Sequence, residues 1–315
     1  MEIEIENNYI VFVFGRKIDY KLYSRFESVE KVESQAFNQL FLDFSQTSFI
    51  TLPGIIYVLY FLNHLKKNKE FFETRLINIK ANIARQLAKF GFLNSSITYG
   101  NLFLDSELEI INNRLMSNFS LENVNNQSSL YFPIKTLPKR SGEHFESDGS
   151  GFTNSFVDYF NLLDMRGEFE GLVNKELVKK KFTKAIYEIG KNIWEHSFSW
   201  GLAAIQSTES TGTSIAICDN GVGFIGSYKH RNPEYVINTD NNRNLIEWLI
   251  VEGNSSKGKN KNGHGLSRVF DFILEVKGTL LIKTDAFEIT LKKDQEKPKI
   301  KSSSFFVGTQ VFINF

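Results

Sequence analysis

A carboxylate, an amide and an imidazole follow one another at intervals of four residues in the second half of the chain. Glu188, Asn192 and His196 therefore share one face of any helix that contains them. A glutamate in such a place can accept a proton from a nucleophile, and an asparagine oxygen suits Mg²⁺. The same strip is typical of the polar face of an ordinary amphipathic helix, so by itself it leaves both interpretations open.

A second group of candidate residues closes a β-rich run. Residues 214–218 (SIAIC) lead into Asp219, and Gly221 and Gly223 follow. A carboxylate at the end of a strand can accept a hydrogen bond from an exocyclic amine such as that of adenine, and glycines let the backbone turn sharply beside a ligand. Asp-Asn-Gly is also common turn chemistry, which is the alternative interpretation.

A third segment is rich in glycine, asparagine and lysine and runs into a helix. Residues 252–269 are EGNSSKGKNKNGHGLSRV, and an apolar helix face begins at Leu266. Backbone N–H groups at the start of a helix attract phosphate, and lysines such as Lys257 suit a lid over a polyphosphate. The segment contains neither GxxxxGK[ST] nor GxGxxG. A solvated lysine-rich loop is the alternative interpretation.

The elements that must position these segments alternate between helix and strand, which predicts an α/β fold. In the second half we expect a long helix over 175–196, a shorter helix from 266, and strands over 203–207, 213–219, 278–284, 287–292 and 310–315. In the first half we expect strands over 9–14, 40–44 and 74–79 and helices over 55–65 and 83–90. The composition predicts a domain over 1–105, a connecting segment over 106–151 and a second domain over 152–315.

The order and spacing of the three segments together resemble the N box and the two glycine boxes of the GHKL ATPase superfamily. Residues 308–313 (GTQVFI) resemble the closing strand of that fold. The resemblance covers about residues 155–315. It implies a Bergerat-type α/β sandwich that binds ATP together with Mg²⁺.

The resemblance also implies roles for individual residues. Glu188 stands at the position of the general base, and Asn192 stands at that of the Mg²⁺ ligand. Asp219 would accept the adenine amine, with Gly223 beneath the base and Thr309 beside it. The further positions that it implies for nucleotide binding are Gly221, Lys257, Gly263, His264, Gly265 and Leu266.

The first half of the chain resembles a STAS (anti-sigma-antagonist) domain. The resemblance rests on residues 42–54 (LDFSQTSFITLPG), which precede a helix, and on residues 83–93 (IARQLAKFGFL). In phosphorylated STAS domains a serine or threonine directly precedes the glycine, and here Pro53 takes that place. We therefore do not expect this domain to be phosphorylated by the chain's own ATPase domain. A generic small α/β domain that packs on the ATPase domain is the alternative.

Three functions fit these features. The first is a nucleotide-driven conformational switch or slow ATPase that regulates a partner protein. The second is a serine/threonine kinase of the anti-sigma-factor type that acts in trans, and the third is a scaffold that holds ATP without turnover. A histidine kinase would need a phosphoacceptor histidine in a helical hairpin, and neither His64 nor His144 lies in such a pattern. Members of the superfamily often work as dimers, so a homodimer is one expected assembly.

Composition and charge narrow the partners and the compartment. The net charge of +1 gives no reason to expect nucleic acid. The longest apolar stretch, residues 55–62, is far shorter than the ~20 residues that span a bilayer, so no membrane insertion is expected. Residues 1–17 are acidic before a short apolar run, unlike a secretory signal, and the single cysteine, Cys218, fits a reducing compartment. The sequence therefore predicts a cytoplasmic protein.

Overall fold

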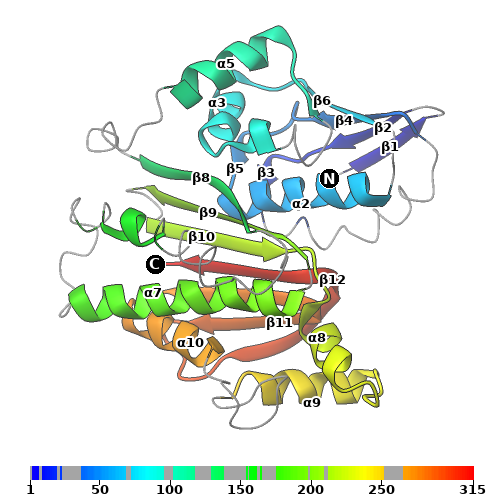
Figure 1. Ribbon diagram of the computed structural model, residues 1–315. Coiled ribbons are helices and arrows are strands. Elements are labelled where there is room, and N and C mark those ends of the chain that lie inside the picture. Colours follow the sequence, from blue (N-terminus) through cyan, green and yellow to red (C-terminus); the bar gives the residue numbers. More distant parts are fainter. Residues whose placement is uncertain are drawn as a thin grey trace. The chain divides into compact units, whose positions relative to one another are not determined.

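The computed structural model gives the chain a mixed α/β fold (Figure 1), which confirms the predicted class. It describes residues 2–6, 9–19, 22, 37–68, 72–95, 102–117, 129–137, 154, 156–161, 164, 175–197, 199–208, 212–251 and 265–315. The chain divides into two compact units. The first comprises Met1–Lys135 with Ala204–Thr208, and the second comprises Thr136–Ala203 with Glu209–Phe315.

The first unit is built on a five-stranded sheet of order β1-β2-β4-β6-β7. The strands are β1 (Glu2–Glu6), β2 (Tyr9–Val13), β4 (Gln39–Asp43), β6 (Glu73–Ile77) and β7 (Leu102–Phe103). Only the β1–β2 pair is antiparallel, and each later pair in this order is parallel. Two short parallel strands, β3 (Lys17–Ile18) and β5 (Phe49–Ile50), form a separate ladder.

Longer helices accompany these strands: α2 (Leu52–Asn68), α3 (Ala81–Lys89) and α5 (Ser106–Ser117). The centre of α2 is apolar on every side and buried throughout residues 55–63, which explains why the sequence predicts it so clearly. Helix α3 ends where Gly91 takes a positive φ of 69°. Helix α5 and strand β8 (Ser129–Leu137) both lie within residues 106–151, the predicted connecting segment.

Another five-stranded sheet has the order β11-β12-β10-β9-β8. Its strands after β8 are β9 (Gly201–Thr208), β10 (Gly212–Asp219), β11 (Thr279–Lys292) and β12 (Lys299–Asn314). Strand β12 is antiparallel to both β10 and β11. It therefore places Thr309 opposite Asp219 on one side and opposite Thr284 on the other.

Strand β11 is one continuous strand, although the sequence predicts two strands over 278–284 and 287–292. The register against β12 shifts at Asp285, the polar residue that interrupts the apolar alternation. The strand therefore continues through this residue with a local irregularity in its pairing. Strand β12 also begins at Lys299, well before residue 310. Its first residues are polar and largely exposed, and they carry little of the apolar signal that marks a strand.

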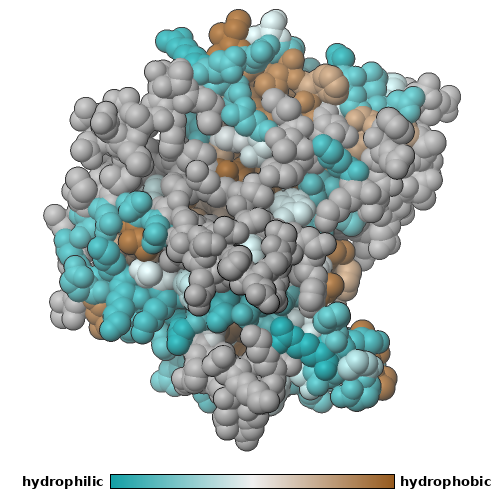
Figure 2. Space-filling model, in the orientation of Figure 1, coloured by the Kyte–Doolittle hydropathy of each residue, from teal (hydrophilic) through white to brown (hydrophobic). Residues whose placement is uncertain are grey.

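Helices α7 (Lys175–Asn192) and α10 (Gly265–Glu275) pack together on one face of this sheet (Figure 1). Phe182 of α7 joins them, because its ring lies 4.7 Å from that of Phe160 and 5.5 Å from that of Phe272 on α10. Such buried rings contribute about 1.5–3 kcal/mol each. The opposite side of α7 carries exposed lysines, and the surface over its N-terminal end is mainly hydrophilic (Figure 2).

Two further helices, α8 (Gly223–Arg231) and α9 (Thr239–Leu249), follow β10. The side chain of Asn238 caps α9 by accepting a hydrogen bond from the backbone N–H of Asn241 at 2.8 Å. Within the described residues, no helix is long and apolar enough to cross a membrane.

Candidate functional site

Helix α7 presents the polar strip that the sequence predicts. Its last α-helical residue is Asn192, and a π-helical turn over Ile193–Ser197 carries the chain on to His196. Glu188 is only 8% exposed and Asn192 is half-buried, whereas the apolar residues between them, such as Ile189, are buried in the core. The strip therefore lies at the boundary of the core and is not a fully solvated helix face.

The start of α10 meets this strip. Gly265 is the first residue of α10, and a Cβ atom at this position would lie 3.2 Å from Oε2 of Glu188 and 3.5 Å from Nδ2 of Asn192. The first of these distances is tighter than most Cβ contacts and the second is an ordinary contact, so a glycine lets the backbone approach Glu188 without displacing its side chain. The structure thus brings together three of the candidate residues, from segments about 75 residues apart.

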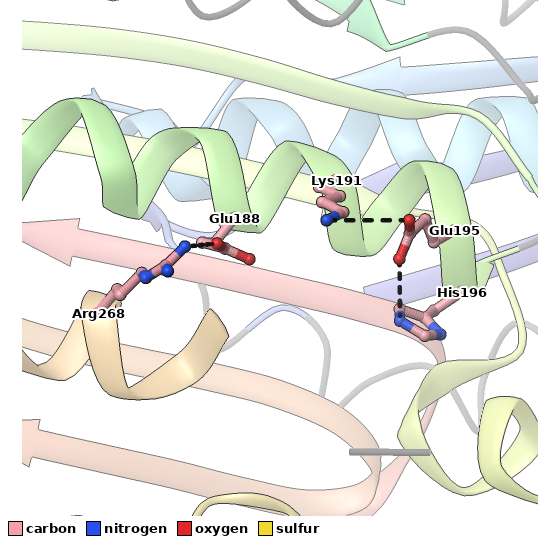
Figure 3. Close-up of polar contacts among 5 residues, drawn as sticks. All are labelled: Glu188, Lys191, Glu195, His196 and Arg268. Atoms are coloured by element: carbon pink, nitrogen blue, oxygen red, sulfur yellow. Dashed lines mark hydrogen bonds and ion pairs between the residues drawn. The ribbon is translucent and has the colours of Figure 1, made fainter. Parts of the chain in front are cut away.

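Arg268 is a residue of this region that the sequence analysis did not identify. It lies one turn into α10 and forms an ion pair with Oε1 of Glu188 (Figure 3). Leu266, the second residue of α10, is half-buried. Lys257, Gly263 and His264 lie outside the described residues.

Asp219 forms a second centre at the end of β10. Its side chain is buried, and Oδ1 accepts a hydrogen bond from the backbone N–H of Gly221 at 2.8 Å. Burial raises the pKa of Asp219 to about 7, while hydrogen bonds from Gly221 and Thr309 act in the opposite direction. The structure therefore brings Asp219, Gly221 and Thr309 together, as the resemblance implies.

The turn after Asp219 leads directly into α8. Gly223 has a φ of +69°, a conformation that side chains of L-residues rarely adopt, and a Cβ there would lie 2.8 Å from the carboxylate of Asp285. Oδ2 of Asp285 accepts hydrogen bonds from the N–H groups of Phe224 and Ile225, at 3.0 and 3.1 Å. Asp285 thus caps the N-terminus of α8 from a strand about 60 residues away.

Asp285 also belongs to the same polar cluster as Asp219. Thr284 donates to Asp285 at 3.0 Å, and the hydroxyls of Thr284 and Thr309 lie 3.3 Å apart. Burial raises the pKa of Asp285 to about 6, against the hydrogen bonds from Ile225 and Thr284 that lower it. Asp285 is not among the residues predicted from the sequence, although it breaks the apolar alternation of β11 and that break is a usable signal.

His196 connects the strip on α7 to α8. Its Nδ1 lies 3.1 Å from Oγ of Ser227, a buried residue of α8. Its Nε2 lies 3.7 Å from Oε2 of Glu195, and Lys191 approaches the same carboxylate at 4.0 Å (Figure 3). In addition, the backbone N–H of Val222 donates to the carbonyl of Ser197 at 3.2 Å. The end of α7 is therefore fixed to the turn that follows Asp219.

The two centres offer complementary chemistry. Glu188 and Asn192 place a carboxylate and an amide beside the backbone N–H groups that open α10. Such a group can hold anionic oxygens and take a proton from a nucleophile. Asp219 and Thr309 provide a buried acceptor and a hydroxyl.

Within the described residues, no three His, Cys, Asp or Glu side chains form a metal-binding group. The amide oxygen of Asn192 is of the kind that could bind Mg²⁺, an ion that prefers oxygen ligands and keeps several waters.

The start of α2 is the place at which the STAS resemblance puts a phosphoacceptor. Oγ1 of Thr51 donates to the carbonyl of Ile18 at 3.2 Å and accepts a hydrogen bond from the N–H of Gly54, also at 3.2 Å. Thr51 is therefore engaged as the helix cap. Pro53, which has no hydroxyl, occupies the second position of the helix.

A scan of the chain against protein-family models gives no match, and a search of the curated proteins likewise finds none.

Proposed function

We propose that the second unit binds ATP with Mg²⁺ and acts as a nucleotide-driven switch or slow ATPase that regulates a partner protein. The observation that carries this proposal is the meeting of Glu188, Asn192 and Gly265. A carboxylate, an amide oxygen and the opening of an 11-residue helix converge there from α7 and α10. The same convergence is what the resemblance to GHKL ATPases implies for the phosphate end of a nucleotide site.

At the phosphate end, each group has a distinct task. The N–H groups at the start of α10 would hold phosphate oxygens, and the amide oxygen of Asn192 would hold the ion. Bound Mg²⁺ would neutralise phosphate charge. Oε2 of Glu188 faces Gly265, so this oxygen would accept the proton of the attacking water.

At the adenine end, Asp219 supplies a buried acceptor for an exocyclic amine. A buried acceptor discriminates strongly, because a ligand without the matching donor leaves it unpaired. Asp285 and Gly223 fix the turn beside it. Because the pKa of Asp219 is raised to about 7, we expect the carboxylate to accept the amine more readily above neutral pH than below it.

Regulation of a partner is favoured over phosphorylation of the chain's own first unit. The hydroxyl of Thr51 caps α2 by accepting a hydrogen bond from the N–H of Gly54, and Pro53 carries no hydroxyl. Phosphoryl transfer to a serine or threonine of a partner uses the same Glu188 and is the alternative outcome, as is ATP binding without turnover.

Calorimetric titration of the full chain with ATP and Mg²⁺ tests the proposal. We expect the wild-type protein to bind and the Asp219→Asn variant to bind about 100-fold more weakly, since an amide replaces the acceptor. Asp294→Asn, the same substitution at an exposed turn, is the matched control and should bind like wild type. Native affinity in Asp219→Asn would contradict the assignment of the pocket. Incubation with γ-labelled ATP then separates released phosphate from labelled partner protein.

A further inference from the structure

Arg268 and Glu188 join α10 to α7 through an ion pair (Figure 3). The Glu188 side chain is 11% exposed, whereas that of Arg268 is 42% exposed. The contact therefore links a largely enclosed carboxylate to a cation that is partly in solvent. The ring contact between Phe182 and Phe272 joins α7 to α10 independently of this ion pair.

The two oxygens of Glu188 have different surroundings. Arg268 contacts Oε1, and Oε2 lies beside Gly265, where an added Cβ would also lie close to the amide of Asn192. A glutamate on its own has several rotamers, and a hydrogen-bonded partner at one oxygen restricts where the other oxygen points. Arginine is suited to this task because its planar guanidinium presents several donors in a rigid arrangement.

We propose that Arg268 is a positioning residue for the reaction that Glu188 supports. By holding Oε1, Arg268 aims Oε2 at the space beside Asn192 and the start of α10, where the attacking water would lie. Arg268 also belongs to the helix that would bind phosphate, so one contact aligns the proton acceptor with the phosphate end of the site. This inference rests on the proposed ATPase function and adds a residue to it.

Steady-state ATP hydrolysis and calorimetry on the full chain test this role. We expect Arg268→Ala to lower kcat about 10- to 100-fold, the loss that follows from misplacing a catalytic group by about an ångström. KM and the Kd for ATP should stay within about 3-fold of wild type, because Arg268 acts on Glu188 and not on the nucleotide. Arg268→Lys should recover part of kcat. Arg243→Ala, which removes an arginine from an exposed pair with Glu247 on α9, is the matched control.

A double-mutant cycle distinguishes action through Glu188 from an independent effect. In a Glu188→Gln background, Arg268→Ala should cause no further loss of kcat. An equal loss in both backgrounds would overturn the proposal, as would a rise in KM, which indicates direct phosphate contact, or a rise in kcat, which indicates an inhibitory pair. If Arg268→Ala does not fold, as judged by thermal unfolding, Arg268→Gln supports the same cycle.

The controls also separate this inference from the proposed function. A wild-type protein that binds no ATP, or binds it without turnover, would overturn the ATPase assignment and this role together. Normal turnover in both the wild type and Arg268→Ala would overturn the role of Arg268 alone.

Discussion

Glu188 and Asp219, the two acidic centres of the second unit, have different surroundings at the edge of the core. Glu188 keeps a cationic partner, Arg268, and remains at the boundary with solvent. Asp219 is buried at the end of β10 and is held by hydrogen bonds from Gly221 and Thr309, yet burial raises its pKa to about 7. Glu188 therefore has a cation beside it, whereas the buried carboxylate of Asp219 is surrounded by hydrogen-bond donors and its burial has a desolvation cost.

This difference matches the two tasks of a nucleotide site. A group that takes a proton in each cycle must return to its starting charge and needs access to water. A group that recognises a base needs a fixed, dry position. The same fold can thus support both tasks. Helix α7 places Glu188 beside the start of α10, and β10 places Asp219 at the turn that contains Gly221.

The largest effect is expected from neutralising the first centre. Glu188→Gln preserves the shape of the side chain and removes its ability to take a proton, so kcat for ATP hydrolysis should fall about 100- to 10,000-fold. The Kd for ATP should change little, because the amide still fits beside Gly265. Glu296→Gln at an exposed turn serves as the control. Unchanged phosphate release from Glu188→Gln would contradict its role as the base.

A smaller loss is expected where the second centre meets α8. Gly223→Ala places a methyl group at a φ of +69° and against the Asp285 carboxylate that caps this helix. The free energy of unfolding should fall by about 2–4 kcal/mol from backbone strain and the disturbed cap. Urea unfolding of the variant and the wild type measures this loss in the free energy of unfolding. Gly15→Ala, at a glycine where an added methyl would meet nothing within 4 Å and where φ is not positive, should be nearly neutral. Equal effects of the two substitutions would show that the turn is not constrained as described.

The sequence predicted the parts of this fold that repeat a simple apolar pattern. Helix α7 follows from the spacing of Phe182, Ile186 and Ile189, and β10 follows from an unbroken apolar run that ends at Asp219. The α/β class is therefore confirmed. The domain boundaries, the STAS and GHKL resemblances and the nucleotide roles stay predictions.

The contacts that organise the site could not be read from local patterns. Arg268 is a single arginine after a lysine-rich segment, and nothing nearby in the sequence indicates that it meets a glutamate 80 residues earlier. Asp285 interrupts the apolar alternation of β11, which split that strand in the prediction, and its role as a cap appears only when α8 packs beside it. Long-range pairing of polar groups depends on tertiary structure, and periodicity reports only on one element at a time.

The smallest effect, and the sharpest test of the comparison, is the dependence of stability on pH. Asp219 titrates near 7 when folded and at 3.8 in its ordinary state, so between about pH 4 and pH 7 the folded chain keeps a proton that the unfolded chain has lost. Unfolding then releases a proton, and the contribution of Asp219 to the free energy of unfolding falls as pH rises through this window.

Asp219→Asn removes this titration while keeping an oxygen that accepts from Gly221. The variant should therefore gain stability relative to wild type as pH rises from 5 to 7, by about 1–3 kcal/mol, while it loses affinity for ATP. Urea unfolding followed by circular dichroism at pH 5, 6, 7 and 8 measures the difference, and Asp294→Asn should show none. A constant difference across these pH values would mean that Asp219 is charged in the folded protein throughout. Asp219 and Glu188 would then differ in their hydrogen-bond and ion-pair partners and not in the effect of burial.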